Sequence, residues 1–580
     1  LRNRMLEAFR KRVLIFSVCV ALAFFILVLQ LFNLQIIQGE EYARKAKSNM
    51  ENFIPIAAPR GEIFDRTFKQ GVSGVALVSN RPSFNIVLIP ENFKSDKELL
   101  EILKNLSKIT PLNPAEALKE LRKGNPWERF IIKDDVSFDV IVKMASHRHL
   151  FHGIFYEDAP VRVYNYSEIF SHAVGYIGSI SREEHDRLKN QGYKYYQTIG
   201  KAGIEREYDS LLRGEDGFIR RIVDVMNRTE GEEVGLEPSA GNNIVLTLDY
   251  DVQKAAFDAL GNSHGTVIAV KPATGEIITI VSKPGYDPNS IISRDNSVII
   301  RDLLADKSKP FLNRSIQAKY PPASTFKLVT TIAALETEKT YPDKGYTCTG
   351  KYTLKGYRDT VFYCFRPHGS LNLYEAIGKS CSVYFYNLGQ RVGPTDIMKY
   401  ADYLGLGEKT GVDIPGEISG FVPSQQWKMK TFGHPWFDDD TINLSIGQGF
   451  LSITPLALAD MLCGIVNNGN IYRPHMLKEV YTPDNSRVIR STKREKIREI
   501  PLSPLTLDTI KKGMRYSVTG GTSARLNYLK APIAGKTGTA QTRSIRKQDA
   551  TQHAWFLGYA PFDGDVDEAV VVVVLIEYGQ

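Results

Sequence analysis

The segment "KYPPASTFKL" (319–328) places a serine and a lysine three residues apart, directly after two prolines. Proline lacks an amide hydrogen and is excluded from a helix interior, so a helix is predicted to begin after Pro322 and to include "STFKLVTTIAALE" (324–336). A spacing of three puts Lys327 on the same helix face as Ser324, where the helix start favours developing negative charge. The pair is either a nucleophile with its base or a serine that caps a helix.

A second Ser-x-x-Lys, at 544–547, lies in the polar, loop-like run "QTRSIRKQDATQ" and has none of these features. The pattern therefore needs support from other segments. A lysine that acts as a base must be neutral. A second cation about 4 Å away would repel its charge by roughly 4 kcal/mol, or about three pKa units. The predicted second cation is Lys536.

Lys536 lies in "APIAGKTGTAQT" (531–542), where small residues such as Gly538 allow a substrate backbone to approach closely. Thr537 and Thr539 offer hydroxyl groups in the same segment. Another Lys-Thr-Gly, at 409–411, precedes the turn-like "GVDIPGE" and is interpreted as structural.

A third polar segment, "GKSCSVYFYNLGQ" (378–390), lies between these two motifs. Ser380 is predicted to start a helix there and to point its hydroxyl into the same site. Helix capping is again the alternative.

The bulk composition is that of a globular protein, with 43% hydrophobic and 24% charged residues. A chain of 580 residues is too long for one hydrophobic core, so two or more domains are expected. The formal net charge is +8, but five basic residues and one acidic residue lie in the first twelve. The remaining excess of positive charge is small for the rest of the chain, so no nucleic-acid partner is predicted.

Residues 13–37, "VLIFSVCVALAFFILVLQLFNLQII", carry no charge. As a helix they would span roughly 37 Å, enough for a bilayer core of about 30 Å. Basic residues before this run and Glu40 and Glu41 after it predict a cytoplasmic N-terminus, with everything after residue 40 outside the cytoplasm. A cleaved signal peptide usually has an apolar run of only about 7–15 residues. We therefore favour a cytoplasmic tail over 1–12 and an uncleaved transmembrane helix over 13–37.

The chain beyond the anchor divides at "TEGEEVGLEPSAGNN" (229–243), a polar, glycine-rich stretch interpreted as a linker. The region 38–240 before it mixes strand-like and helix-like runs, such as "FNIVLIP" (84–90) and "DKELLEILKNLSKI" (96–109). It is predicted to form a mixed domain.

The region 241–580 starts with strand-like runs and becomes helical from about 324 to 470. It returns to strands at 553–561 and 568–578. This order predicts an α/β (α+β) fold, in which one sheet is closed by the two ends of the region and a helical layer packs against it.

The order of the three motifs resembles the signature of penicillin-binding proteins and serine β-lactamases, which is Ser-x-x-Lys, then Ser-x-Asn, then Lys-Thr-Gly. In this chain the middle motif is Ser-x-Ser. The departure is Ser382, which stands where that family carries Asn or Asp. Three segments resemble the pedestal motifs of class B penicillin-binding proteins: "RGEIFDR" (60–66), "RVYNYSEIFSHAVGYIG" (162–178) and "GKAGIEREYDSLLRGEDG" (200–217).

Three further segments, "GEISGFVPSQQWK", "TINLSIGQGFLSITPLALA" and "HAWFLGYAP", are similar to the transpeptidase domain of that class. The stretch 427–449 resembles the elongation-type members more than the division-type ones. The family fold usually ends with one more helix, so we expect that the sequence is truncated after Gln580.

The resemblance implies a dimerisation-type pedestal domain over 38–240. It also implies a β-lactamase-like transpeptidase domain over 241–580, an antiparallel sheet with helices on both sides. The implied activity is a peptidoglycan D,D-transpeptidase that cross-links stem peptides during cell elongation and is a penicillin target. The implied location is the bacterial inner (plasma) membrane, with the large domains in the periplasm. The implied partners are a SEDS-family glycosyltransferase and other elongation-complex proteins.

The resemblance also implies a role for each motif. Ser324 attacks the D-Ala–D-Ala carbonyl with Lys327 as base, and Ser380 relays the proton toward the leaving D-Ala. The residues implied to bind substrate are Lys536 and Thr537 at the terminal carboxylate, Thr539 with the Ser324 amide at the oxyanion, and Ser382 and Gly538 beside them.

Rival functions make different demands on the sequence. A β-lactamase needs a deacylating Glu, and no Glu-x-x-x-Asn element lies between the second and third motifs. A β-lactam sensor, which binds without turnover, needs several membrane spans and usually a His-Glu-x-x-His protease, which this sequence lacks. A bifunctional class A enzyme needs a glycosyltransferase domain. A division-type transpeptidase and a D-Ala–D-Ala carboxypeptidase remain open alternatives.

Cys348, Cys364, His368 and Cys381 form a four-ligand set suited to tetrahedral zinc. The alternative is a Cys348–Cys364 disulfide with Cys381 as a buried thiol. Zinc is reported for some elongation-type relatives in this segment, with acidic residues in place of two thiols, so the resemblance supports a metal. Its predicted role is structural, because it would tie Cys381, next to Ser380, to the preceding hairpin.

Overall fold

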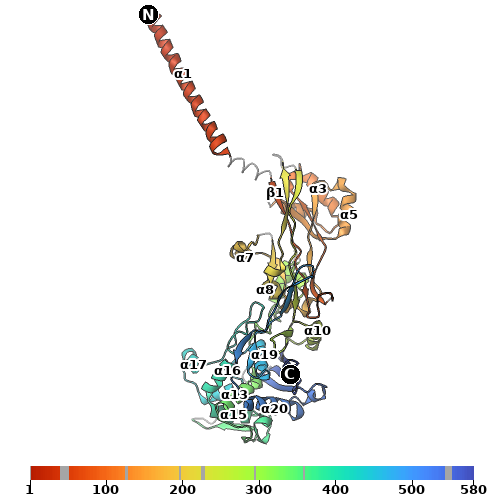
Figure 1. Ribbon diagram of the computed structural model, residues 1–580, viewed down its shortest axis with the longest axis vertical. Coiled ribbons are helices and arrows are strands. Elements are labelled where there is room, and N and C mark those ends of the chain that lie inside the picture. Colours follow the sequence, from red (N-terminus) through yellow and green to blue (C-terminus); the bar gives the residue numbers. More distant parts are fainter. Residues whose placement is uncertain are drawn as a thin grey trace.

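A computed structural model describes residues 2–39, 51–72, 74–123, 129–194, 197–223, 229–292, 296–356, 360–541 and 552–579. Figure 1 shows a molecule with helix α1 (Arg2–Phe32) at one end and the C-terminal region at the other. α1 continues as a π-helical turn, Asn33–Ile37, and residues Phe9–Ile37 are long and apolar enough to cross a membrane. This finding fits the predicted anchor.

The N-terminal domain after the anchor is built from short strands and helices. One part of it, which we call the head, consists of α3, α4 and α5 packed on the three-stranded sheet β5-β4-β6. The head strands and helices include the predicted strand at 84–90 and the predicted helix at 96–109. The elements are β1 Glu51–Ile56, β2 Ile63–Phe64, β3 Ala76–Arg81, β4 Phe84–Leu88, α3 Asp96–Leu106, α4 Pro114–Leu121, β5 Phe130–Val136, α5 Phe138–Ser146, β6 Ile154–Asp158, β7 Val161–Tyr164, α6 Ser171–Val174, β8 Ile177–Ser179, α7 Arg182–Leu188, β9 Thr198–Gly200, α8 Gly203–Glu207, α9 Asp209–Leu212, β10 Gly217–Val223 and β11 Thr229–Leu236.

The predicted linker at 229–243 is wrong for its first half. Residues Thr229–Leu236 form strand β11, which pairs antiparallel with β10 in the sheet β1-β10-β11. The side chains from Glu233 to Leu236 are exposed. A strand held by main-chain pairing, with both faces toward solvent, lacks the apolar alternation by which strands are found in sequence.

Buried ion pairs hold the pedestal motifs together. The guanidiniums of Arg60 and Arg162 lie 2.7 and 2.8 Å from opposite oxygens of the Glu205 carboxylate, which is completely buried. Arg60 also pairs with Asp209 at 2.7 Å. Burial raises the pKa of Glu205, but the two guanidiniums outweigh it and hold the pKa below its usual range.

The C-terminal region contains the strands and helices that position the site. They are β12 Asn243–Leu246, α10 Tyr250–Ala259, β13 Gly265–Val270, β14 Ile277–Lys283, α11 Pro288–Ile292, α12 Ser297–Ala305, α13 Lys327–Glu336, β15 Tyr346–Cys348, β16 Lys351–Leu354, β17 Thr360–Tyr363, β18 Gly369–Leu371, α14 Leu373–Gly378, α15 Ser382–Val392, α16 Pro394–Tyr403, α17 Gln425–Phe432, α18 Asp438–Ser445, α19 Pro455–Val466, β19 Asn470–Tyr472, β20 Leu477–Tyr481, β21 Val488–Ser491, β22 Lys496–Glu499, α20 Pro504–Gly520, β23 Ala534–Gln541, β24 Gln552–Ala560 and β25 Val570–Ile576.

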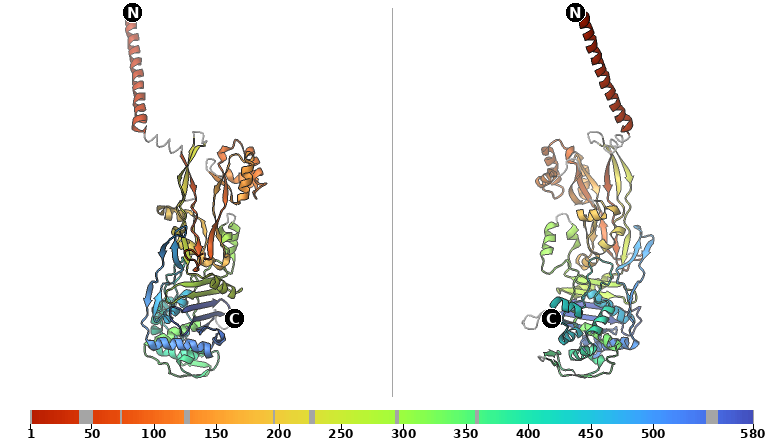
Figure 2. Two further views of the ribbon diagram at one scale, coloured as in Figure 1. Left: turned by 45° about the vertical axis from the view of Figure 1, so that its right-hand side comes forward. Right: turned by 90° about the vertical axis from the view of Figure 1, so that its left-hand side faces the viewer.

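The main sheet has the order β14-β13-β25-β24-β23, and β13 pairs antiparallel with β25. The two ends of the region therefore close one sheet, as predicted. Its pleat presents Val267 and Val574 to the α10 side and Ile268 and Val573 to the large core that includes α19. Helices consequently cover both faces, and Figure 2 shows the sheet and helices stacked at the end of the molecule far from α1.

A second sheet joins the two domains. Its order, β21-β20-β12-β2-β3-β7, mixes strands from both regions, and β12 runs parallel to β2. The pedestal is thus hydrogen-bonded to the C-terminal region through a continuous sheet.

Candidate active site

The nucleophile candidate lies in a tight turn rather than in the α-helix itself. Residues Ala323–Phe326 form a 3-10 turn, and α13 begins at Lys327, three residues later than the predicted start at Ser324. Side chains at i and i+3 eclipse in 3-10 geometry, so Ser324 and Lys327 share a face. The Ser324 hydroxyl caps neither helix, which removes the capping alternative. It is partly exposed.

The turn carries backbone strain. Ala323 has a φ of +49°, a left-handed conformation uncommon for a residue other than glycine. Its amide donates to the carbonyl of Gly447 at 2.9 Å. Such strain is characteristic of functional sites when the surrounding structure holds it in place.

Ser380 also has left-handed backbone geometry, with a φ of +53°. The prediction that Ser380 starts a helix is wrong by two residues, because α15 begins at Ser382. The cap is Cys381, whose sulfur accepts a hydrogen bond from the Tyr384 amide. Ser380 is therefore free of a capping role, and its hydroxyl is available to the site.

Lys536 reaches Ser380 from the edge strand β23. Its side chain is completely buried, and its ammonium donates to the Ser380 hydroxyl at 2.8 Å and to the Thr537 carbonyl at 2.9 Å. Burial, and then repulsion from Lys327, lower its pKa well below the ordinary lysine value.

Lys327 approaches the same serine from the other side. Its ammonium donates to the Ser380 carbonyl at 2.8 Å and lies 3.4 Å from the Ser380 hydroxyl. It also lies 3.2 Å from the Ser382 hydroxyl and 5.5 Å from the centroid of the Phe385 ring. All three predicted motifs therefore meet at Ser380.

The pKa of Lys327 is lowered to about 8, and burial is the main cause. Repulsion between the two ammonium groups, which lowers the pKa of Lys536, acts in the same direction on Lys327, because it disfavours both lysines being charged at once. Burial is therefore the larger cause of the Lys327 shift, and the predicted second cation adds to it.

Two residues that sequence reasoning missed contact the third motif. The Gln448 amide lies 3.5 Å from the Thr539 carbonyl. The Thr537 hydroxyl donates to the hydroxyl of Thr522 at 2.8 Å. Gln448 lies in the segment "TINLSIGQGFLSITPLALA", whose resemblance to the transpeptidase domain points to it. No spacing rule connects Thr522 to a Lys-Thr-Gly motif downstream. Gly538 lies between Thr537 and the exposed Thr539, and its backbone faces Thr325 and Pro322.

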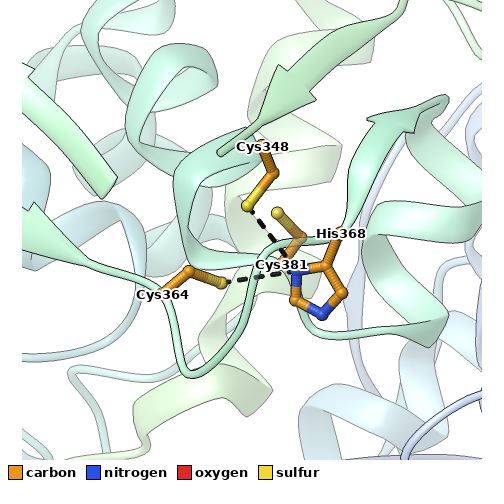
Figure 3. A group of neighbouring side chains, drawn as sticks. All are labelled: Cys348, Cys364, His368 and Cys381. Carbon is orange, nitrogen blue, oxygen red and sulfur yellow. Dashed lines mark hydrogen bonds between the residues drawn. The ribbon is translucent and has the colours of Figure 1, made fainter. Parts of the chain in front are cut away.

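The predicted metal ligands converge (Figure 3). The ligand atoms of Cys348, Cys364, His368 and Cys381 all lie within 4.8 Å of one another. His368 Nδ1 is 3.7 Å from the sulfur of Cys348 and 3.5 Å from that of Cys364. All five cysteines of the chain are free thiols, so the structure contains no Cys348–Cys364 disulfide.

The electrostatics of this cluster favour one thiolate. The Cys381 thiol and then backbone amides, including that of Ser382 at 3.3 Å, donate to the sulfur of Cys364 and lower its pKa. A thiolate is the form that binds metals. Because Cys381 and Ser382 follow Ser380 directly, the cluster adjoins the second motif.

The duplicate motifs have different outcomes. Lys409–Gly411 belongs to a turn in which Glu417 accepts from the Thr410 hydroxyl and amide, both at 2.7 Å, and from the Gly411 amide at 3.0 Å. Its geometry agrees with the structural interpretation. The second Ser-x-x-Lys, at 544–547, lies outside the described residues.

Two family models match the chain. They are the penicillin binding protein transpeptidase domain, over residues 265–580, and the penicillin-binding protein dimerisation domain, over residues 55–246. The peptidoglycan D,D-transpeptidase MrdA of Escherichia coli K12 is 28% identical over 596 residues, which covers 98% of this chain and 91% of that protein. The resemblance inferred from the motifs is confirmed.

Solved structures agree with the family models. Penicillin-binding protein PBP2 of Helicobacter pylori, in its complex with MreC, has a TM-score of 0.78 at 27% identity and covers 92% of this chain and 96% of that chain. A chain from a peptidoglycan synthase complex that coordinates polymerization and crosslinking has a TM-score of 0.72 at 28% identity. The match covers 98% of this chain and 95% of that chain. The predicted fold is confirmed.

Proposed function

Since the chain belongs to the penicillin-binding protein transpeptidase family, we propose that it uses Ser324 as the nucleophile of a peptidoglycan D,D-transpeptidase of the elongation type. The observation that carries this mechanism is the position of two lysine ammonium groups, from Lys327 and Lys536, at 3.4 and 2.8 Å from the Ser380 hydroxyl. A hydroxyl held between two buried lysines, one of which follows Ser324 by three residues, is suited to moving protons during acyl transfer.

Acylation begins with neutral Lys327, which accepts the proton of Ser324 as its oxygen attacks the D-Ala–D-Ala carbonyl. The carbon–nitrogen bond to the last D-Ala then breaks. The proton passes through the Ser380 hydroxyl to the leaving amine, because that hydroxyl contacts Lys327 and faces the same site. The amine of a neighbouring stem peptide attacks the resulting ester and loses a proton to neutral Lys327. That proton returns to the Ser324 oxygen as the ester bond breaks and the new amide forms.

Substrate recognition falls to the residues of β23 that face outward. The Ser324 and Thr539 amides are the proposed oxyanion donors, and such donors are typically worth about 2.7–4 kcal/mol. The Thr537 hydroxyl is the proposed direct contact of the terminal carboxylate. Lys536 is buried and bonded to Ser380 and to the Thr537 carbonyl, so its proposed role at the carboxylate is to hold these groups in position. Ser382 and Gly538 complete the site.

Mass spectrometry with a defined pentapeptide tests this function. We expect an acyl-enzyme on Ser324 that has lost one D-Ala, and a cross-linked product when an amine acceptor is added. Ser324→Ala should abolish both, as well as labelling by a fluorescent penicillin. Release of the hydrolysed tetrapeptide alone, in the presence of the amine, would instead identify a carboxypeptidase.

The Cys/His cluster fits zinc, and we assign it a structural zinc ion. Three thiols and an imidazole are a common tetrahedral donor set, and sulfurs at about 2.3 Å from zinc lie roughly 3.8 Å apart. The observed spread of up to 4.8 Å needs only a small contraction. When bound, zinc would crosslink the β16–β17 hairpin to Cys381 and so fix the backbone of Ser380.

The apolar helix Phe9–Ile37 supports a single-pass anchor in the inner membrane, with a cytoplasmic N-terminus and periplasmic domains. The H. pylori relative was solved with MreC and another relative within a peptidoglycan synthase complex. We infer that this chain binds comparable elongation proteins, with the glycan strands supplied by a SEDS-family glycosyltransferase.

Anchor exchange tests the partner proposal. Replacing residues 1–37 by a soluble tag should leave penicillin labelling of Ser324 intact but abolish co-purification with the glycosyltransferase. Unchanged co-purification would show that the anchor does not carry the contact.

A further inference from the structure

The terminal carboxylate of the donor peptide has few direct partners in the third motif. Lys536 is completely buried, and its ammonium is already bonded to the Ser380 hydroxyl and the Thr537 carbonyl. The Thr537 hydroxyl is half-buried and remains accessible. A carboxylate has two oxygens and is most stable when both accept hydrogen bonds. Besides the exposed Thr539 on the same strand, a further donor next to Thr537 would strengthen the binding of both oxygens.

Thr522 supplies such a group from a different element. It lies in the loop after α20, is exposed, and its hydroxyl oxygen is 2.8 Å from the Thr537 hydroxyl. The hydroxyl is also 3.2 Å from that of Ser517 and 3.5 Å from the Gly378 carbonyl. It thus lies beside Thr537 with one face toward solvent.

The backbone around Thr522 is held firmly. Its amide donates to the Gly378 carbonyl at 3.1 Å, two residues before Ser380. The amides of Gly521 and Ser523 on either side both donate to the Ser517 carbonyl, at 3.2 and 2.9 Å. The position of the hydroxyl is therefore set by the segment that leads to Ser380 and by the end of α20, before any substrate binds.

We propose that Thr522 is a further substrate-binding residue, whose hydroxyl pairs with that of Thr537 to bind the terminal carboxylate of the donor peptide. The proposal rests on the proposed transpeptidase function. In the free protein Thr537 donates to Thr522. Hydroxyl hydrogens rotate freely, so both can turn toward an arriving carboxylate and exchange a neutral hydrogen bond for stronger charge-assisted ones.

The alternative is that Thr522 only ties its loop to β23. The two roles differ in how they depend on the ligand's charge. A carboxylate-binding hydroxyl affects ligands that carry the carboxylate and spares those in which it is masked, whereas a loop tie affects both alike. Benzylpenicillin and its methyl ester form a matched pair of probes, because both acylate through the same β-lactam carbonyl.

The experiment measures the second-order rate constant for acylation of Ser324 in the full-length, detergent-solubilised protein. Thr522→Val keeps the shape and removes the hydroxyl. We expect about a tenfold loss with benzylpenicillin and less than about a twofold change with the ester. Thr522→Ser, which restores the hydroxyl, should recover the benzylpenicillin rate to within about twofold. Thr522→Ala provides a second deletion if the valine variant folds poorly.

Thr519→Val is the matched control. Thr519 is exposed on the last turn of α20, and its hydroxyl contacts the Arg515 carbonyl of its own helix at 3.4 Å. The acylation rates of Thr519→Val with both probes should equal those of the unmodified protein. Equal losses of both probes in Thr522→Val, or no loss with benzylpenicillin, would overturn the role of Thr522. Absence of acylation at Ser324 in the unmodified protein would overturn the proposed function itself.

Discussion

The ammonium of Lys327 lies 3.2 Å from the hydroxyl of Ser382, the residue that stands where the Ser-x-Asn signature has Asn. The shorter side chain therefore still contacts the base. The contact follows from the start of α15 at Ser382, which places this hydroxyl in the first turn of the helix and next to Ser380.

Removing that contact should slow acylation. In Ser382→Ala the Lys327 ammonium loses one of its hydrogen-bond acceptors and is held less precisely, so we expect roughly a tenfold fall in the acylation rate by a β-lactam. Ser382→Asn should stay within about threefold of the unmodified rate, because the amide oxygen can replace the hydroxyl. Ser370→Ala, at an exposed serine of β18, is the control. An unchanged rate in Ser382→Ala would refute a role for this contact.

The low pKa of Lys327 predicts the pH dependence of acylation. The base works only when neutral, and with a pKa of about 8 it is roughly one-tenth neutral at pH 7 and roughly nine-tenths neutral at pH 9. The acylation rate should therefore rise about tenfold between these values and level off above them. Stopped-flow measurements with a chromogenic β-lactam would show this. A rate that is flat from pH 7 to 9 would contradict the assignment of Lys327 as base.

The same shift affects stability. The Lys327 pKa is about 8 in the folded chain and 10.5 ordinarily, so the unfolded chain binds more protons between these values. This residue therefore makes the folded state more stable as pH rises from about 8 to 10.5. Lys327→Met should abolish that part of the pH dependence of unfolding, which denaturant titrations at several pH values would measure.

Glu205 is expected to be essential to the stability of the pedestal. Glu205→Gln leaves the guanidiniums of Arg60 and Arg162 buried without their shared carboxylate, which should cost about 3–5 kcal/mol. Thermal or denaturant unfolding would measure the loss. The control is Asp258→Asn, which breaks an exposed pair with Lys254 on α10 and should have little effect. Similar effects of the two substitutions would contradict this view of the pedestal core.

Zinc content tests the cluster shown in Figure 3. Protein purified without chelator should contain about one zinc per chain, and Cys364→Ser or His368→Ala should remove most of it. Cys463→Ser changes a buried cysteine outside the cluster and should leave the zinc content unchanged. Chelation should lower the thermal midpoint and make three further thiols reactive. Near-zero zinc together with a linked Cys348–Cys364 peptide would rule the metal out.

Much of the fold was predictable because its signals are local. The charge-free run at 13–37, the prolines before Ser324 and the strands at 553–561 and 568–578 each show a strong pattern within a short window. The strand β11 was missed for the opposite reason. It is held by main-chain pairing to β10, and its described side chains from Glu233 onward face solvent, so no side-chain pattern marks it.

The catalytic motifs were also identifiable, since their residue types and order are unusual and their chemistry is specific. The sequence by itself thus predicted Ser324, Lys327 and Lys536 as site residues, and the structure places the two lysines against Ser380. It also singled out the four Cys/His residues, because thiols and imidazoles are typical zinc ligands.

Tertiary structure decided how these residues interact. The pKa of Lys327 depends on burial against residues such as Phe385, which no charge count anticipates. The left-handed backbone of Ser380 and its place outside α15 depend on how its segment packs in the folded chain. The contact between Thr522 and Thr537 likewise forms only when their two segments meet in space. Hydrogen bonds and desolvation act over a few ångströms, so residues far apart in the chain can determine them only after the chain has folded.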